Sequence, residues 1–527
     1  MSSKFSSLGI TLLFLIFIGC SNGTSITNLK TEYQSEPIGI DEQHPRFSWQ
    51  MKSDRYGARQ LAYQLTVATS RKALDNGQYV FKTEKVNSDN SLNIVYDGDE
   101  LKPSTRYFWQ VTVWDENNRQ IKSDVAWFET GLLNSGWSNA QWIGSEFPPL
   151  SKYRSNFDID YDVKVNEKGS DAVFIFGARD SANYVMLGLH LINNSTHVII
   201  SHLHDGVLLK DYETNASKII PASAFHNTHH INIHSQTDWF ARTYNISIVI
   251  DGVALSEDHI VIDNSRTEMW EPYCRLYSIG FKQSKEQAAN YSNIVISEKS
   301  WNTELYRKEN PMEGVGQEEI HIWCPGEEKS APMLRKEIAI SKGVSSAKLY
   351  VTARGTYQFF INGNKVGHDF LNPGSSDFRH HIFYNTYDIT SMLKKGDNAL
   401  GAVLGAGWYT DYAMGLQHQQ DQYGVEESLL AKIIIEYNDG TTETVVTDDS
   451  WKCYDYGPIL SNSLQNGMDY DARREVKNWN EANFDDSQWY NAKIYPQLPD
   501  SIEIINYIGS PIVNDITWSA VSVSEPK

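Results

Sequence analysis

Alternation of apolar and polar residues dominates the chain, and helical periodicity is almost absent. The alternating segments are short, and turn residues such as Asp97 and Gly98 separate them. Because successive side chains of a strand point to opposite faces, each segment predicts a strand with one buried face. The repeated alternation of short strands and turns predicts an all-β protein built of tandem β-sandwiches.

The first sandwich is expected over residues 26–133. Its alternating segments are residues 46–51, 62–69, 107–114 and 125–130. Pro103 and Thr105 precede a tryptophan-rich strand in a way that resembles a fibronectin type III domain. Trp109 and Trp114 are five residues apart, which places them on opposite faces of a straight strand. We therefore expect at least one of them in the core, and a sugar-binding platform on both is the alternative.

Residues 134–149 predict a linker strand, and residues 150–306 predict a second, inserted sandwich. The inserted part resembles a concanavalin-type jelly roll. Its alternating segments are residues 173–176, 184–189, 197–201, 230–234, 246–250, 276–281 and 291–297. A polar connector over residues 307–316 then leads to a third sandwich, expected over residues 320–497 and resembling galactose-binding domains. Residues 498–527 predict the start of a following β-domain.

Two turn signals stand inside the third sandwich. Asn362 and Gly363 separate two short apolar segments and favour a type I′ hairpin, since both residues tolerate positive φ. Residues 396–398 (GDN) predict a second turn ahead of the apolar strand 399–404.

The motifs of this third sandwich resemble the N-terminal β-domain of bacterial α-L-rhamnosidases, glycoside hydrolase family 78. Ser375 departs from the family pattern, which usually has tryptophan there. The matching residues are Ile361–Asn362–Gly363, Pro373–Gly374, Asp377, Tyr387–Asp388–Ile389–Thr390, Asn398–Ala399 and Leu404–Gly405–Ala406–Gly407–Trp408–Tyr409, together with residues 46–49 (RFSW) and 468–473 (MDYDAR).

Net charge and the N-terminal segment narrow the expected partners. The chain has 46 basic and 66 acidic residues, a formal charge of −20, which repels phosphate backbones, so nucleic acid is not an expected partner. Residues 1–25 predict a signal peptide with an apolar core over residues 8–18. Gly19 and Cys20 resemble a lipobox, which implies acylation of Cys20 and a membrane-anchored lipoprotein facing the periplasm. Ordinary cleavage within residues 23–25 is the alternative.

A cluster of histidines could bind a metal ion and pairs of acidic residues could act as acid and base, but for both groups a structural role is the favoured interpretation. His226, His229, His230 and His234 lie close together in the sequence, but His230 and His234 on one strand face would stand about 13 Å apart, too far for one metal ion. The remaining cysteines have no metal-binding spacing. The acidic pairs fall at turns, where aspartate caps the backbone. The pairs are Asp448–Asp449, Asp485–Asp486 and Asp469 with Asp471.

The predicted carbohydrate-binding site combines Trp408, Tyr409, Asp377 and Asp411. Aromatic rings stack on the apolar face of a sugar, and carboxylates bind its hydroxyl groups. The alternative is that the two aromatic rings pack at the edge of the sandwich. The resemblance extends to carbohydrate-binding module family 67, in which calcium can assist L-rhamnose binding, but it assigns no calcium ligand in this sequence.

The resemblance also implies what activity to expect. In the family, an (α/α)6 barrel after the β-domains carries the general acid and base that hydrolyse terminal α-L-rhamnose. The sequence shows no such barrel, so we expect the N-terminal substrate-recognition half of a rhamnosidase, acting on rhamnose-containing glycans and inactive alone. Two alternatives stay open: a free glycan-binding lipoprotein, and a structural half that docks with a separately encoded barrel.

Overall fold

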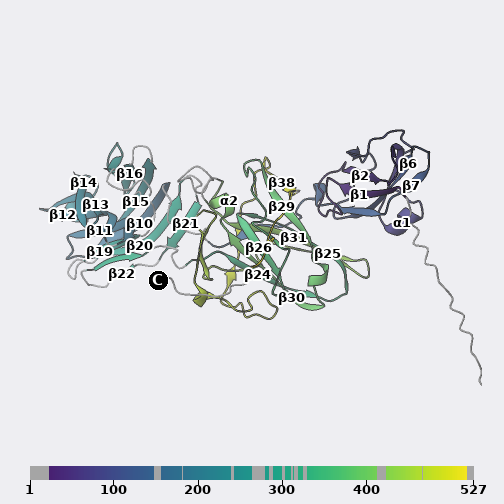
Figure 1. The fold of residues 1–527 in the computed structure, drawn as a ribbon. Coiled ribbons are helices and arrows are strands. Elements are labelled where there is room, and N and C mark those ends of the chain that lie inside the picture. Colours follow the sequence, from purple (N-terminus) through teal and green to yellow (C-terminus); the bar gives the residue numbers. More distant parts are fainter. Residues whose placement is uncertain are drawn as a thin grey trace, which may run out of the picture. The chain divides into compact units, whose positions relative to one another are not determined.

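Strands form nearly all of the regular structure (Figure 1). The computed structural model describes residues 23–146, 156–180, 182–238, 243–263, 279–283, 289–299, 303–309, 312–313, 319–323, 329–411, 423–465, 467–507 and 509–518. The chain divides into two compact units, Met1–Gly136 and Trp137–Lys527. The all-β prediction is therefore confirmed. The described helices have at most five residues, and none could cross a membrane.

The first unit is one sandwich of two sheets. One sheet has the order β1 (Ser25–Thr31), β2 (Arg46–Lys52), β5 (Ile94–Val95). The other has the order β4 (Phe81–Lys82), β3 (Gln60–Ala68), β6 (Arg106–Asp115), β7 (Gln120–Lys122), with β8 (Ala126–Glu129) also on β6. Helix α1 (Arg71–Asp75) follows β3, and the Ser70 hydroxyl accepts from the Ala73 N–H at its start. The short 3-10 helix η1 (Leu133–Ser135) follows β8.

Both tryptophans of β6 are buried, so the alternative of a sugar platform on them is wrong. Trp109 is fully buried, and its ring centroid lies 4.8 Å from that of Phe47. Trp114 lies on the other face of β6 and is only 9% exposed. The Lys85 ammonium lies 4.5 Å from the centroid of its ring. The cation therefore covers the face that a sugar would need.

The second sandwich opens the second unit. Its larger sheet has the order β17 (Val253–Ala254), β16 (Thr243–Ile250), β15 (Thr228–Asp238), β10 (Asn156–Val165), β20 (Ala289–Glu298), β21 (Thr303–Lys308), with β18 (Ile260–Asp263) on β16 and β22 (Met312–Glu313) on β20. The other sheet has the order β14 (Val207–Asn215), β13 (Ser195–His204), β12 (Asn183–Ile192), β11 (Asp171–Asp180), β19 (Ile279–Gln283), β23 (Glu319–Trp323). A 3-10 turn, η2 (Ala222–Ala224), precedes β15.

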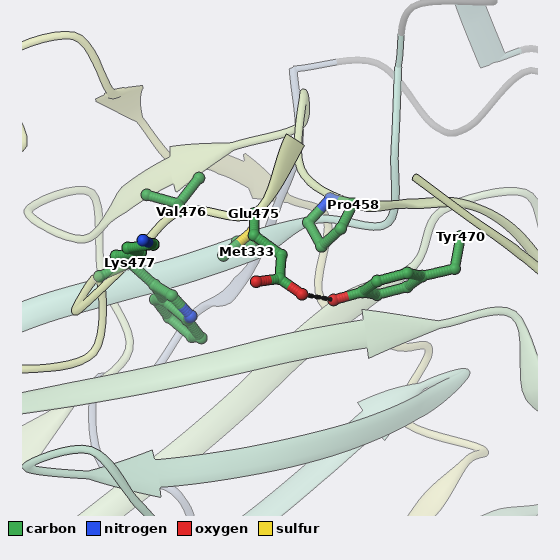
Figure 2. A pocket seen from close by; sticks show the side chains of 7 residues that line it. Met333, Pro458, Tyr470, Glu475, Val476 and Lys477 are labelled. Atoms are coloured by element: carbon green, nitrogen blue, oxygen red, sulfur yellow. Dashed lines mark hydrogen bonds between the residues drawn. The ribbon is translucent and has the colours of Figure 1, made fainter. Parts of the chain in front are cut away.

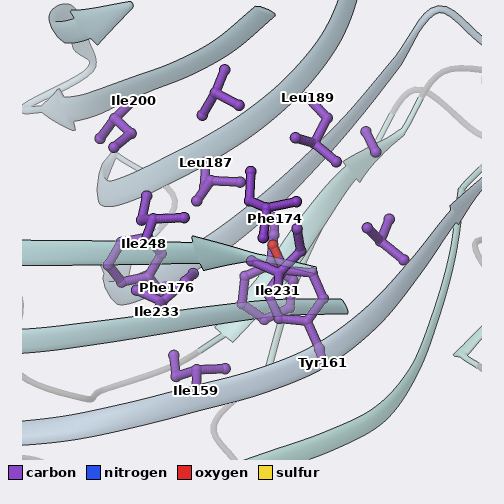
Figure 3. Close-up of a cluster of buried hydrophobic side chains, with 14 of the residues drawn as sticks. Ile159, Tyr161, Phe174, Phe176, Leu187, Leu189, Ile200, Ile231, Ile233 and Ile248 are labelled. Atoms are coloured by element: carbon purple, nitrogen blue, oxygen red, sulfur yellow. The ribbon is translucent and has the colours of Figure 1, made fainter. Parts of the chain in front are cut away.

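Isoleucines and aromatic residues fill the space between these two sheets (Figure 3). The Tyr161 ring of β10 stacks on the Phe174 ring of β11 with 4.1 Å between centroids, and both side chains are 1% exposed. Each such buried side chain contributes roughly 1.5–3 kcal/mol to folding. The alternation along β10 places its apolar residues in this core, while Asp160 and Asp162 are half-buried on its other face.

The third sandwich completes the second unit. One sheet has the order β27 (Asn364–Lys365), β26 (Thr356–Ile361), β30 (Gly396–Gly405), β24 (Met333–Ile340), β33 (Lys452–Tyr454), β36 (Tyr490–Asn491). The other has the order β37 (Lys493–Tyr495), β9 (Trp142–Gly144), β31 (Ser428–Tyr437), β25 (Val344–Arg354), β29 (His381–Asp388), β38 (Glu503–Asn506), with β32 (Thr442–Val446) on β31.

Short strands and short helices lie in the loops of this sandwich. Two strand pairs stand apart from the main sheets, β28 (Asp369–Phe370) with β39 (Ile512–Val513) and β34 (Ile459–Ser463) with β35 (Gly467–Tyr470). The short helices are α2 (Gly407–Thr410), η3 (Thr390–Met392) and η4 (Ala472–Arg474).

Three boundaries differ from those that the sequence predicted, because alternation identifies a strand but not its partner. Strand β9 of the predicted linker pairs with β31 and β37, so it belongs to the third sandwich. Strand β23 pairs with β19, so residues 319–323 belong to the second sandwich instead of opening the third. Strands β38 and β39 pair with β29 and β28, so residues 503–513 close the third sandwich and do not open another domain.

The predicted hairpin is confirmed, and the predicted second turn is displaced. Asn362 and Gly363 have φ values of 49° and 80° and join β26 to β27. Residues 396–398 already belong to β30, where they pair with β24. The turn precedes them, and the buried Asn398 side chain closes it: its Oδ1 accepts from Lys394 N at 2.9 Å and its Nδ2 donates to Lys394 O at 2.7 Å.

Candidate functional site

Helix α2 carries the two aromatic residues of the predicted sugar site, and it buries one of them. Tyr409 is 6% exposed, and its ring meets Phe378 edge-on at 5.3 Å between centroids. Burial raises the pKa of the Tyr409 phenol to about 12. Trp408 is half-buried against the same cluster. Tyr409 is therefore a core residue and offers no ring face to a sugar, which corrects its predicted role.

The two carboxylates of the predicted site are both engaged within the protein. Asp411 is 4% exposed, and its Oδ2 accepts from the Leu464 N–H at 2.6 Å, which links α2 to the end of β34. Asp377 accepts from Arg379 Nε at 2.8 Å and Nη2 at 3.0 Å. The hydrogen bond to Arg379 lowers the pKa of Asp377 to about 2. The loop that carries Asp377 does lie against α2, since the Phe378 ring contacts the Tyr409 ring. A sugar-binding role for Trp408 and Asp377 stays a prediction, and Cys20 lies outside the described residues.

Three of the four clustered histidines, His229, His230 and His234, are paired with acidic residues. His230 and His234 share one face of β15, as predicted, and their Nδ1 atoms lie 2.9 Å from Asp162 and 2.6 Å from Asp158 of β10. His229 points the other way and is 5% exposed, with Asp251 at 2.7 Å. Within the described ranges, no group of three or more histidine, cysteine or acidic side chains could hold a metal ion.

One member of each acidic pair of the third sandwich makes a local hydrogen bond, as the positions at turns predict, while Asp486 pairs with the distant Arg335. Asp469 accepts from the Ser461 hydroxyl at 2.6 Å, and Asp485 accepts from the Ser487 N–H at 3.1 Å. The hydrogen bond from Arg473 lowers the pKa of Asp471 to about 2. Across the described residues, every carboxyl group with a shifted pKa is shifted downward. The general acid of a glycosidase requires the opposite shift.

A pocket opens where the start of β24 meets the segment from Pro458 to Trp479 (Figure 2). It has a volume of about 210 Å³. Its lining combines apolar, aromatic and charged side chains: Met333, Pro458, Tyr470, Glu475, Val476, Lys477 and Trp479. The Tyr470 hydroxyl donates to Glu475 Oε1 at 2.8 Å, as the dashed line in Figure 2 shows. In the sequence, part of this segment stands out only as a family motif, residues 468–473, and no local pattern there predicts a pocket.

One buried cation supports the pocket wall. Arg335 of β24 is 1% exposed. Its Nε donates to Trp479 O at 2.9 Å, and its guanidinium also forms ion pairs with Glu337 and Asp486. The ring of Trp479 covers Gly401 so closely that a Cβ there would lie 2.8 Å from it. Trp479 is therefore held from both its backbone and its ring.

Comparison with known proteins identifies two of the three sandwiches. Residues 26–134 match the Rha78A-like, N-terminal immunoglobulin domain, and residues 342–511 match the alpha-L-rhamnosidase N-terminal domain. The first sandwich is thus immunoglobulin-like, and the finer fibronectin type III and jelly-roll assignments stay predictions. The match at 342–511 includes β38, in agreement with the strand pairing.

The curated relatives and a solved structure extend the similarity across the chain. An α-L-rhamnosidase of Streptomyces avermitilis is 29% identical over 95% of this chain and 48% of its own length. One of Formosa agariphila is 25% identical over 87% of this chain and 32% of its own length. The crystal structure of the Streptomyces avermitilis α-L-rhamnosidase complexed with L-rhamnose has a TM-score of 0.59 at 25% identity, covering 93% of this chain and 46% of that one.

The chain thus spans less than half the length of these relatives. The matched domains, their order and their motifs all come from one family. This chain therefore contains the N-terminal, non-catalytic β-domains of the family 78 α-L-rhamnosidases.

Proposed function

We propose that this chain is the substrate-recognising β region of an α-L-rhamnosidase and that it binds rhamnose-containing glycans. The observation that carries the proposal is the succession of two matched rhamnosidase domains on one chain, with similarity to α-L-rhamnosidases over 95% of its length. The third sandwich supports it further, because its pocket offers aromatic, carboxylate and ammonium groups of the kind that bind sugars.

Hydrolysis belongs to the helical barrel that the family resemblance places after these domains. A glycosidase needs two carboxyl groups on either side of the scissile bond, one of them kept protonated by a raised pKa. Asp471 accepts hydrogen bonds from the Arg473 guanidinium and Asp485 from the Ser487 N–H, which lowers the pKa of both carboxyl groups and favours their ionised form. We expect the chain alone to release no nitrophenol from an aryl α-L-rhamnoside.

Binding and hydrolysis are tested on the same preparation. Titration with a rhamnose-rich polysaccharide in a calorimeter should give heat that a rhamnose-free glucan of similar length does not. Hydrolysis of the aryl rhamnoside above the uncatalysed rate, abolished by Asp469→Asn or Asp471→Asn, would place catalysis in the β region instead. No heat with any rhamnose-containing ligand would reject the proposed function.

The proposal allows two alternatives for how the β region functions. The chain either functions with a barrel encoded in the same or a separate reading frame, or binds glycans at the cell envelope by itself. Sequencing the DNA that follows the codon of Lys527 separates these forms. A barrel-encoding frame next to it favours docking, and pull-down of that barrel by this chain tests the contact directly.

Anchoring through Cys20 is part of the proposal for the envelope. It rests on Gly19 and Cys20, which follow the apolar core of the predicted signal peptide. The mature protein should partition into detergent, and Cys20→Ala should abolish this behaviour. Mass spectrometry that finds an unacylated N-terminus at Ser25 or later would reject the anchor.

A further inference from the structure

The pocket beside Trp479 has a polar side with two groups that the protein leaves available. Tyr470 occupies only one oxygen of the Glu475 carboxylate. The other oxygen and the Lys477 ammonium have no hydrogen-bond partner among the described residues. Both residues are exposed to solvent. An acceptor and a donor therefore stand two positions apart at the pocket mouth, free to bind neighbouring hydroxyl groups.

The pocket also has apolar lining residues. Met333 is 4% exposed, and Val476 is half-buried (Figure 2). Trp479 adds part of its indole ring, which is half-buried. Aromatic and aliphatic walls of this kind suit the C–H face of a sugar ring and a methyl group. The polar and apolar residues together match a ligand that is polar along one edge and apolar along the other.

The pocket walls are preorganised. The Trp479 ring meets Phe360 edge-on at 5.8 Å and stacks on Trp489 at 6.1 Å between centroids. Arg335 binds the Trp479 carbonyl oxygen from inside the sandwich. The Asp471 N–H donates to Pro458 O at 2.8 Å, which ties the loop after β35 to the far wall. These side chains are already ordered in the folded protein, so binding a ligand costs little further conformational entropy.

The volume limits the ligand to one sugar ring. At about 210 Å³ the pocket is smaller than the roughly 300–1,000 Å³ of sites for drug-sized molecules. We propose that this pocket binds a single terminal 6-deoxyhexopyranose, the rhamnose unit of the glycan, with Glu475 and Lys477 on its hydroxyl groups and Met333 and Val476 around its methyl group. The proposal rests on the proposed function and assigns it a site.

The test uses L-rhamnose as probe and the full chain, with binding followed by saturation-transfer NMR. We expect a dissociation constant of roughly 1 mM, and L-lyxose, which lacks the C6 methyl group, should bind about fourfold more weakly. Glu475→Gln and Lys477→Met should each weaken L-rhamnose binding about tenfold, because each removes a charge-assisted hydrogen bond. Glu436→Gln and Lys395→Met change the same residue types at exposed positions outside the pocket and should leave binding unchanged.

Each outcome separates the pocket from the broader function. If the rhamnose polysaccharide and L-rhamnose bind the wild type but bind both pocket variants equally well, this site is wrong and the proposed function stands. If the wild type binds neither ligand, the proposed function fails together with the site. Equal binding of L-rhamnose and L-lyxose would overturn the apolar methyl contact, and with it the assignment to a 6-deoxy sugar. Because Glu475 and Lys477 are exposed, both variants should keep the wild-type Tm.

Discussion

Replacing Arg335 should destabilise the third sandwich more than any exposed arginine would. The guanidinium is 1% exposed and lies among Glu337, Asp486 and the carbonyl oxygens of Trp479 and Glu481. Removing one partner of a buried ion pair costs about 3–5 kcal/mol. Asp486 and Glu337 keep 30% and 34% of their side chains exposed and can be rehydrated, so the lower end applies to Arg335→Met, about 3 kcal/mol.

Calorimetry measures this loss, because the two compact units can unfold in separate transitions. At roughly 2.1 cal/mol/K of unfolding entropy per residue, a cost of about 3 kcal/mol lowers the Tm of the unit Trp137–Lys527 by roughly 4 °C. Fluorescence should follow the same transition, since Trp479 and Trp489 lie in the affected wall. The matched control is Arg473→Met, because the Arg473 side chain is 90% exposed and its ion pair with Asp471 is solvated, so its loss should leave the Tm nearly unchanged.

The size of the difference between the two variants decides the outcome. If Arg335→Met and Arg473→Met lower Tm equally, the buried guanidinium contributes no more than a solvated one. The pocket wall would then not depend on Arg335 for its position, although Arg335 binds the Trp479 carbonyl oxygen. A large Tm loss with unchanged L-rhamnose binding would instead separate stability from the site.

Three further predictions concern the same sandwich. Gly355→Ala should lower the free energy of unfolding by more than about 1 kcal/mol, since φ is +117° and the added Cβ would clash with a carbonyl oxygen of β30. Gly440→Ala is the control, because φ is +78° but the space around it is open, and it should lower the free energy of unfolding, measured in urea, by only about 1 kcal/mol. Burial raises the pKa of Asp388, but the hydrogen bonds from Lys348 and Thr390 together outweigh it and the pKa falls from 3.8 to about 2. The carboxylate therefore stabilises the fold above about pH 3.8 and stops doing so as the pH falls through about 2. Asp388→Asn removes this contribution, so the Tm of the variant should fall less than that of the wild type across that window. Because 46% of the Asp388 side chain is exposed, the difference in the free energy of unfolding stays below about 1 kcal/mol. Trp408→Ala should lower Tm without changing polysaccharide binding, and the reverse result would restore the sugar site that the sequence predicts.

The sequence by itself determined the local elements. Alternation along residues 107–114 predicts strand β6, and Asn362 with Gly363 predicts the hairpin that the φ values confirm. These features depend on neighbours in the chain: a strand's two faces follow from its pleat, and a type I′ turn from residues that tolerate positive φ. The family could be identified for the same reason, since its motifs are short and contiguous.

For the candidate sugar site, the sequence predicted which residues lie near one another but not which of them are buried or paired. It placed Asp377 and Tyr409 in one site, and Phe378 next to Asp377 does contact Tyr409, but it could not tell that Tyr409 is buried or that Arg379 binds Asp377. Burial depends on which other side chains cover a ring. An aromatic residue after a glycine turn has the same local sequence whether it faces solvent or the core.

Only the tertiary structure decided which distant segments meet. The pocket joins Met333 at the start of β24 to residues 458–479, more than a hundred positions later, and its support at Arg335 reaches Asp486. Strand β9 pairs with β31 across the whole inserted sandwich. Alternation fixes which face of a strand is buried but is equally satisfied by many partners, so pairing is decided by the packing of the complete core.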